Sequence, residues 1–132
     1  MSFLAFVLFA VAPQQQPAVA PKPFLLSQHA SMKLMHKNCM TWRKKYGKSQ
    51  LELDEDCCKI AQRWANYMAR TGAFHHGGGE QIIAYGSDFD GVFNMWMNSP
   101  GHRYWLLSNT KKCGWGYQVS SDGTPYWVGV FR

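Results

Sequence analysis

The chain has 132 residues, of which 46% are hydrophobic and 15% aromatic, so a dense apolar core is expected and a disordered or fibrous protein is excluded. The length fits one domain of ordinary size. Fourteen Lys and Arg against eight Asp and Glu give a formal net charge of +6, which favours anionic surfaces such as cell wall or lipid headgroups. Nucleic acid is not an expected partner, because no recognition motif accompanies the charge.

An apolar segment, Ser2–Ala12, is followed by a Pro- and Gln-rich stretch, Pro13–Pro23. About ten apolar residues in a row are typical of a signal peptide, whereas a membrane-spanning helix needs roughly 20. The second stretch is typical of an extended linker. We therefore predict that residues 1–23 are leader and linker and that residues 24–132 are the folded domain. We expect an extracellular or periplasmic location, with membrane tethering by an uncleaved leader as the alternative.

Two amphipathic helices are predicted in the first half of the domain. Apolar side chains recur every three or four residues over 32–46, with Ser27 as the expected N-cap and Gly47 as the stop. The second helix is marked more strongly, because Asp54 can cap its first turn and Gly72 can end it. Its apolar stripe consists of Cys57, Ile60, Ala61, Trp64, Ala65 and Met68.

A short strand and two short helices are predicted next. Residues 81–85 have the composition of a strand, and a helix is expected to begin at Ser87 or Asp88. Ser99 and Pro100 then begin a further helix, with Ser as the N-cap and Pro in the first turn.

A β-hairpin is predicted at the carboxyl end. Residues 115–120 and 126–131 are rich in aromatic and β-branched side chains, and Ser121–Thr124 between them is a turn signal. Helices thus come first, one strand lies between them and the hairpin comes last. This order predicts an α+β domain whose small antiparallel sheet is covered by helices.

The four cysteines, Cys39, Cys57, Cys58 and Cys113, form no C-x-x-C motif, which excludes a zinc ribbon or a thioredoxin-like site. An even number in a secreted domain permits two disulfides. Neighbouring cysteines rarely bond each other, so links from Cys57 or Cys58 to Cys39 or Cys113 are the options. Buried free thiols are the alternative.

Two polar clusters carry the side chains suited to chemistry. His75, His76 and Glu80 flank a glycine run, and imidazole and carboxylate groups are ligands for a divalent cation such as Zn²⁺. An exposed polar loop is the other interpretation. His102 follows the predicted Ser99 cap in the first helical turn, where the helix dipole lowers the pKa of an imidazole and favours its neutral form.

Taken together, these motifs resemble the CAP superfamily (cysteine-rich secretory proteins, antigen 5 and pathogenesis-related 1), also called the SCP domain, in its short bacterial secreted form. The resemblance runs from about Leu26 to Phe131, and its segments occur in family order. They are Asp54–Met68, Gly72–His76, Gly79–Gly86, Trp96–Arg103, Gly114–Gly116 and Tyr126–Phe131. The resemblance implies an α-β-α sandwich.

The resemblance also implies a cleft formed by His76, Glu80, Ser99 and His102. In relatives that bind zinc, the two histidines are the ligands, which here means His76 and His102, and the glutamate supports them or a bound water. His75 is the less favoured alternative to His76. Ser99 stands where many members have a second glutamate.

Two functions are compatible with this cleft. The first is a secreted module that binds a divalent metal, an apolar ligand or a cell-surface partner without catalysis, its partner being lipid, the cell envelope or another secreted protein. The second is a zinc-dependent hydrolase of peptide or cell-wall bonds, with zinc on His76 and His102 and with Glu80 as the general base. Otherwise no cofactor is expected. A fold alone does not choose between them, because function depends on the site.

Overall fold

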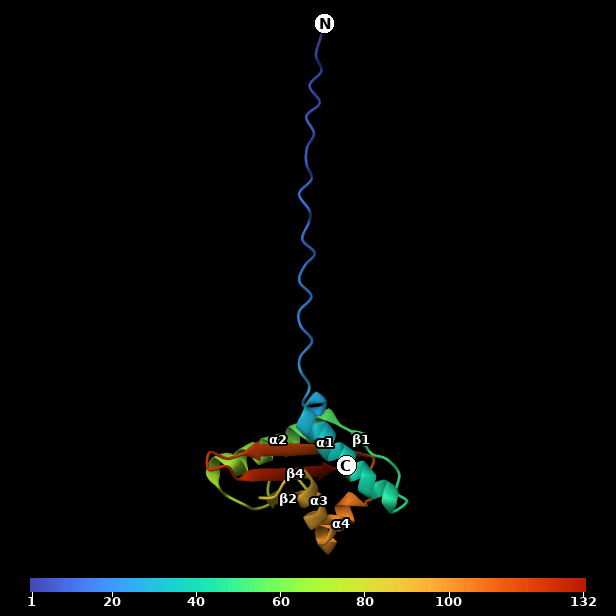
Figure 1. Ribbon diagram of the computed structural model, residues 1–132, viewed down its shortest axis with the longest axis vertical. Helices are drawn as coiled ribbons and strands as arrows, with labels where there is room; N and C mark the ends of the chain where they lie inside the picture. Colours follow the sequence, from blue (N-terminus) through green and yellow to red (C-terminus); the bar gives the residue numbers. More distant parts are fainter.

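The computed structural model describes residues 1–132 and contains four α-helices and a four-stranded sheet. Residues 1–25 form no helix or strand and extend away from the folded part (Figure 1). No helix is both long enough and apolar enough to cross a membrane. The elements in chain order are η1 (Leu26–Gln28), α1 (Ala30–Lys45), β1 (Glu52–Leu53), α2 (Glu55–Thr71), β2 (Ile82–Tyr85), α3 (Phe89–Met97), α4 (Pro100–Leu106), β3 (Lys112–Val119) and β4 (Pro125–Phe131).

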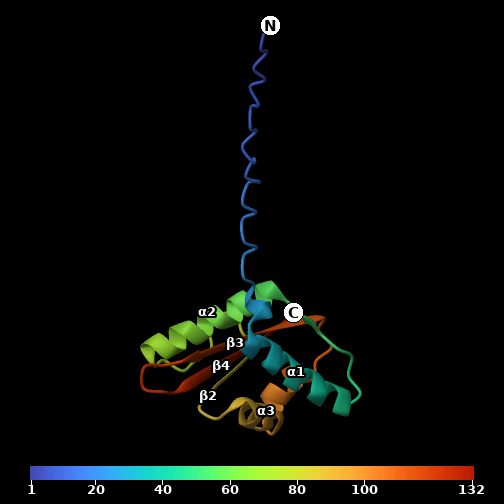
Figure 2. The same ribbon diagram turned by 45° about the horizontal axis from the view of Figure 1, so that its top comes forward.

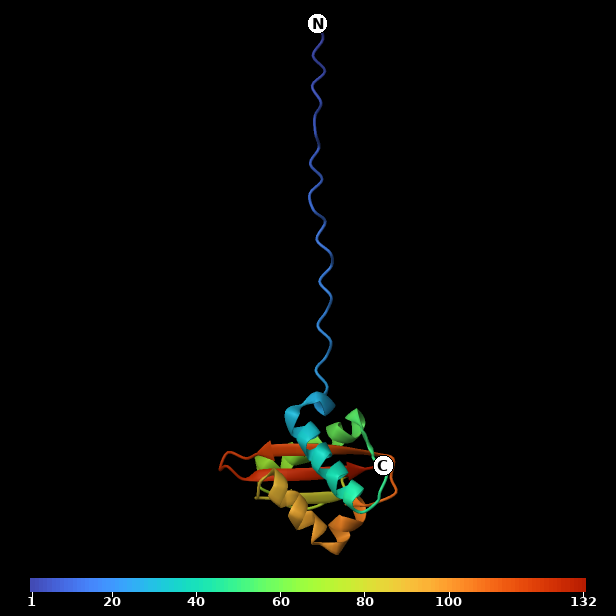
Figure 3. The same cartoon turned by 45° about the vertical axis from the view of Figure 1, so that its right-hand side comes forward.

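The sheet lies between two layers of helices (Figure 2). α2 covers one face, where its apolar side chains pack against Ile83, Val128 and Val130. α1, α3 and α4 lie on the other face, with α1 crossing the strands obliquely (Figure 3). A larger apolar cluster fills that side and includes Trp96 and Trp115. The predicted α+β class and the α-β-α sandwich are confirmed.

The sheet has the strand order β1-β3-β4-β2. β4 pairs antiparallel with β3 and with β2, so the predicted hairpin is confirmed. The predicted antiparallel sheet gains one strand that was not predicted, because β1 runs parallel to β3 through the pairs Glu52↔Lys112 and Leu53↔Cys113. A strand of two residues is too short to show an alternating pattern, so only the contact with β3 defines it.

Two glycines allow α2 to lie directly on β3. A Cβ atom at Gly114 would collide with the backbone of Cys58, and one at Gly116 would collide with the carbonyl of Ala61. Any side chain at these positions would therefore have to push the helix away from the strand.

This close approach also satisfies the free side of β3. The side-chain oxygen of Gln62, on α2, accepts a hydrogen bond from the Tyr117 N–H at 3.0 Å. The Gln62 amide nitrogen donates to the Tyr117 carbonyl at 2.8 Å. One side chain thus occupies backbone groups that a neighbouring strand would otherwise pair.

The start of α1 differs from the prediction. Ser27 lies in η1 instead of capping α1, and the N-cap is His29, whose Nδ1 accepts from the Ser31 N–H at 3.3 Å. The reason is Glu55 in the first turn of α2. Its carboxylate accepts from the N–H groups of Leu26 at 2.8 Å and Ser27 at 2.7 Å, which holds this segment in a 3₁₀ turn.

The other predicted helix boundaries are confirmed. Asp54 caps α2 by accepting from the Cys57 N–H at 2.9 Å, and Gly72 ends it with a φ of 73°. Asp88 caps α3, and Pro100 begins α4. These boundaries depend on local backbone hydrogen bonds, which is why residue type alone identifies them.

No disulfide joins the four candidate cysteines, which are all buried free thiols. Cys57 packs in the cluster beneath α2, whereas Cys39, Cys58 and Cys113 lie in the larger cluster on the other face. Burial raises the pKa of Cys58 to about 11 and the pKa of Cys39 and of Cys57 to about 12. The thiols therefore stay protonated at neutral pH and pack as small apolar groups.

We expect Gly116→Ala to lower the free energy of unfolding by about 3 kcal/mol, because the added methyl group must displace α2 from β3. Gly101→Ala is the matched control, since a Cβ there meets nothing within 4 Å and Ala favours the helix. Urea unfolding of both variants measures the difference. Equal stabilities would contradict the backbone-to-backbone contact.

The contact of Glu55 with η1 predicts a pH-dependent stability. Burial raises the pKa of Glu55, but the hydrogen bonds from Ser27 and Leu26 outweigh it and hold this pKa below its usual value of 4.5. Stabilisation by a group with a depressed pKa is present above the unfolded value and is lost as the pH falls through the folded value. Glu55→Gln should therefore be less stable than the native chain near pH 7, and the gap should close below about pH 4. Urea unfolding across this range tests it, and a gap independent of pH would contradict it.

Candidate functional site

The loop between α2 and β2 turns around the carboxylate of Glu80. That side chain is 0% exposed, yet its charge is well satisfied. The carboxylate accepts from the N–H groups of Gly77 at 3.0 Å and Gly78 at 2.7 Å, and its Oε1 lies 2.9 Å from Nδ1 of His76. Three nitrogen donors thus compensate a buried charge, which is the condition under which a carboxylate is tolerated in the interior.

The contact with Glu80 fixes the tautomer of His76. Because the carboxylate accepts at Nδ1, that nitrogen carries a proton, and in the neutral ring Nε2 therefore keeps its lone pair. The His76 side chain is 57% exposed, so the imidazole remains open to ligands. A carboxylate behind a histidine is the usual support for a metal-binding imidazole.

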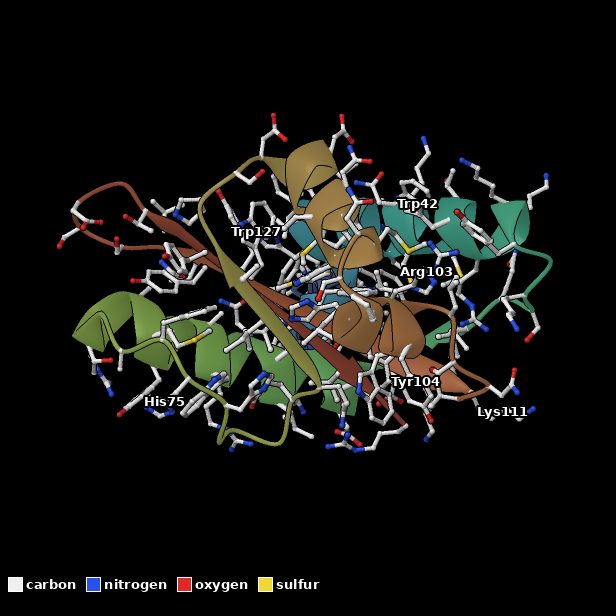
Figure 4. The ribbon with its side chains drawn as sticks, turned by 90° about the horizontal axis from the view of Figure 1, so that it is seen from below. Trp42, His75, Arg103, Tyr104, Lys111 and Trp127 are labelled. Carbon is white, nitrogen blue, oxygen red and sulfur yellow. The ribbon has the colours of Figure 1, made fainter.

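His75 is placed differently. Its ring packs edge-on against Trp64 and Tyr67, with centroid distances of 5.4 and 6.2 Å, and its carbonyl accepts from Trp64 Nε1–H at 3.0 Å. Figure 4 shows His75 beside α2, far from Arg103 on α4. The structure therefore places His76, and not His75, against Glu80.

The second imidazole comes from α4. Ser99 occupies the N-cap position of this helix, but its side chain makes no capping hydrogen bond, contrary to the expectation that its oxygen is used there. His102 lies in the first turn and is partly buried. Burial lowers the pKa of His102, and His76 lowers it further when the His76 ring is protonated. The pKa is lowered in the predicted direction, with burial as its first cause.

The residues present supply two candidate metal ligands. His76 and His102 each offer an imidazole, and Nδ1 of His102 is buried without a hydrogen-bond partner. Glu80 is already engaged by three nitrogen donors. No group of three or more His, Cys, Asp or Glu side chains is arranged to hold a metal ion. His76 and His102 are thus the two candidate imidazole ligands, one fewer than the three protein ligands of a catalytic zinc.

Sequence reasoning missed the role of Trp64. This residue was assigned to the apolar stripe of α2, but its indole lies under the loop, where a Cβ on Gly78 would collide with it. The glycine run beside a tryptophan was the available signal, since glycine is required where backbone closely approaches a bulky group. A groove of about 530 Å³ lies beside this contact and is lined by Arg63, Trp64, Asn66, Tyr67, Arg70 and Gly78.

Comparison with solved structures finds the same fold. An outer surface protein from Borrelia burgdorferi aligns with a TM-score of 0.69 and 23% identity over 80% of this chain and 92% of its own. A cysteine-rich secretory protein from Staphylococcus aureus aligns with a TM-score of 0.50 and 21% identity over 74% of this chain and 38% of its own.

Comparison of sequences gives the family. A protein of Borreliella burgdorferi described as uncharacterized is 26% identical over 120 residues, which cover 76% of this chain and 77% of that protein. The profile of the CAP family, described as the cysteine-rich secretory protein family, matches residues 38–131. This match includes His76, Glu80 and His102, and it covers all four strands of the sheet. The chain therefore belongs to the CAP, or cysteine-rich secretory protein, family.

Proposed function

We propose that this CAP module acts outside the cell as a non-enzymatic binding protein, and that its His76–His102 pair binds a divalent transition-metal ion such as Zn²⁺. The apolar leader supports export. The similar fold of an outer surface protein from Borrelia burgdorferi also supports exposure at the cell surface.

One observation carries the metal proposal: the 2.9 Å contact between His76 Nδ1 and Glu80 Oε1. It leaves Nε2 of His76 as an oriented ligand when that ring is neutral, and the lowered pKa of His102 favours its neutral, ligating form. An ion held by only two imidazoles keeps open coordination positions. Water or a side chain of a binding partner would fill them, so the metal would serve as a contact point.

The same contact disfavours hydrolysis. A general base needs a carboxylate oxygen within reach of the attacking water. Both oxygens of Glu80 already accept backbone N–H groups, and the side chain has no exposed surface. Glu80 thus holds the loop together and is poorly placed to take a proton from water.

We expect zinc titration of the full chain by calorimetry to show one site that is lost in His76→Ala and in His102→Ala. His75→Ala is the matched control, because its ring packs on Trp64 and Tyr67 and should leave binding unchanged. Zinc binding of native strength in either the His76 or the His102 variant would contradict the proposal, as would absence of binding by the native chain.

The support by Glu80 gives a second expectation. Glu80→Gln removes the charge behind His76 and should weaken zinc binding by about tenfold, the effect typical of such supporting groups. Circular dichroism and thermal unfolding check that the variant keeps its fold. Unchanged zinc affinity in a folded Glu80→Gln protein would show that the carboxylate has no part in metal binding.

A further inference from the structure

The net charge of this protein is confined to one segment. Residues 30–51, which include all of α1, contain six Lys and Arg and no Asp or Glu. The other eight Lys and Arg are balanced by the eight Asp and Glu elsewhere. The formal charge of +6 is therefore the charge of α1 and the loop after it.

The lysines of α1 form a stripe on its outer side. Lys33, Lys37 and Lys44 are exposed and recur at i, i+4 and i+11, which places them on one side of a helix. The buried side chains of α1 face the sheet on the opposite side. The stripe spans about 16 Å along the axis. At the flank of α1, the side-chain amide of Asn38 donates to Asp90 of α3 at 3.5 Å.

A second basic group lies at the carboxyl end of α1, over aromatic rings on the side of the helix that faces α4. The Lys45 ammonium lies 5.0 Å from the centre of the Trp42 ring, which stacks on Tyr46. The guanidinium of Arg103, on α4, lies 4.5 Å from the Tyr46 ring. Figure 4 shows Trp42 and Arg103 on the same side of the molecule. Lys48 adds a further exposed charge in the following loop.

This arrangement does not stabilise the fold. Like charges four residues apart on a helix repel, as with Lys33 and Lys37, and no carboxylate compensates the stripe. An external anionic surface would attract each of these lysines and so offset the repulsion between them.

We propose that the outer face of α1 docks on a membrane surface rich in anionic phospholipid. A row of exposed lysines matches a plane of negative headgroups. Leu34 is 40% exposed beside the stripe, and apolar side chains at such a position suit the boundary between headgroups and acyl chains. They are not needed for a soluble polyanion, which the charge alone would attract.

The chain before α1 agrees with a membrane partner. Pro13–Pro23 separates the apolar segment Ser2–Ala12 from the folded domain. In an extended conformation at about 3.1 Å per residue, it reaches about 35 Å. A leader held in a membrane would thus keep α1 within reach of the same surface.

The test is sedimentation of the full chain with vesicles of phosphatidylcholine alone or with about one-third phosphatidylglycerol. Binding to neutral vesicles reports on the leader, and the increase on anionic vesicles reports on charge. The triple variant Lys33→Glu, Lys37→Glu, Lys44→Glu should lose this increase, a drop of about tenfold or more. High salt should abolish it in the native chain.

α2 provides a matched control. Lys59, Arg63 and Arg70 are exposed and have the same i, i+4, i+11 spacing, so reversing them changes the net charge equally. This variant should keep most of the increase. If both variants lose the increase on anionic vesicles equally, only the overall charge matters. If the α1 variant binds as strongly as the native chain, membrane binding is due to the leader. Binding to heparin without binding to anionic vesicles would assign the face to a soluble polyanion, and each of these results would overturn the proposal.

Discussion

The backbone contact between α2 and β3 is the constraint on which the site depends. Gly114 and Gly116 carry no side chain, so the helix lies directly on the strand. This position carries Trp64 under the glycine-rich loop, where its indole N–H binds a loop carbonyl. The loop amides then point inward to Glu80, and Glu80 holds His76. A continuous set of short contacts therefore links the sheet to the exposed imidazole.

The position of His102 on α4 depends on α1, because Arg43 of α1 is buried and bonds to the end of α4. Nε of Arg43 donates to the Ser49 carbonyl at 2.7 Å, and Nη1 donates to the carbonyls of Leu106 at 3.0 Å and Ser108 at 2.7 Å. These bonds satisfy orphan carbonyls where α4 ends and tie that helix to α1. His102 lies in the first turn of α4, so α1 helps to position His102 while the outer face of α1 stays exposed. The same helix thus serves the site from inside and presents lysines outside.

The structure separates charges that hold the fold from charges that are available to a partner. Glu80 accepts hydrogen bonds from backbone N–H groups of the loop before β2, and Glu55 accepts them from the N–H groups of η1, so both carboxylates stabilise the fold. Arg43 does the same for carbonyls. The lysines of α1 have no such partner and face solvent. The proposed metal binding at the histidine pair and the proposed docking through α1 would therefore use different residues.

The sequence by itself determined the helices, the hairpin and the α+β class. It did so because caps such as Asp54 and Gly72 act over a few residues. The resemblance to the family proposed His76, Glu80 and His102 as site residues, and the structure brings His76 and Glu80 into contact. Only the tertiary structure decided that Ser27 does not cap α1, that β1 joins the sheet in parallel and that the cysteines stay unpaired. It alone showed Glu80 fully engaged by the loop. Each of these features depends on groups brought together by folding, or on burial, and local sequence patterns do not encode them.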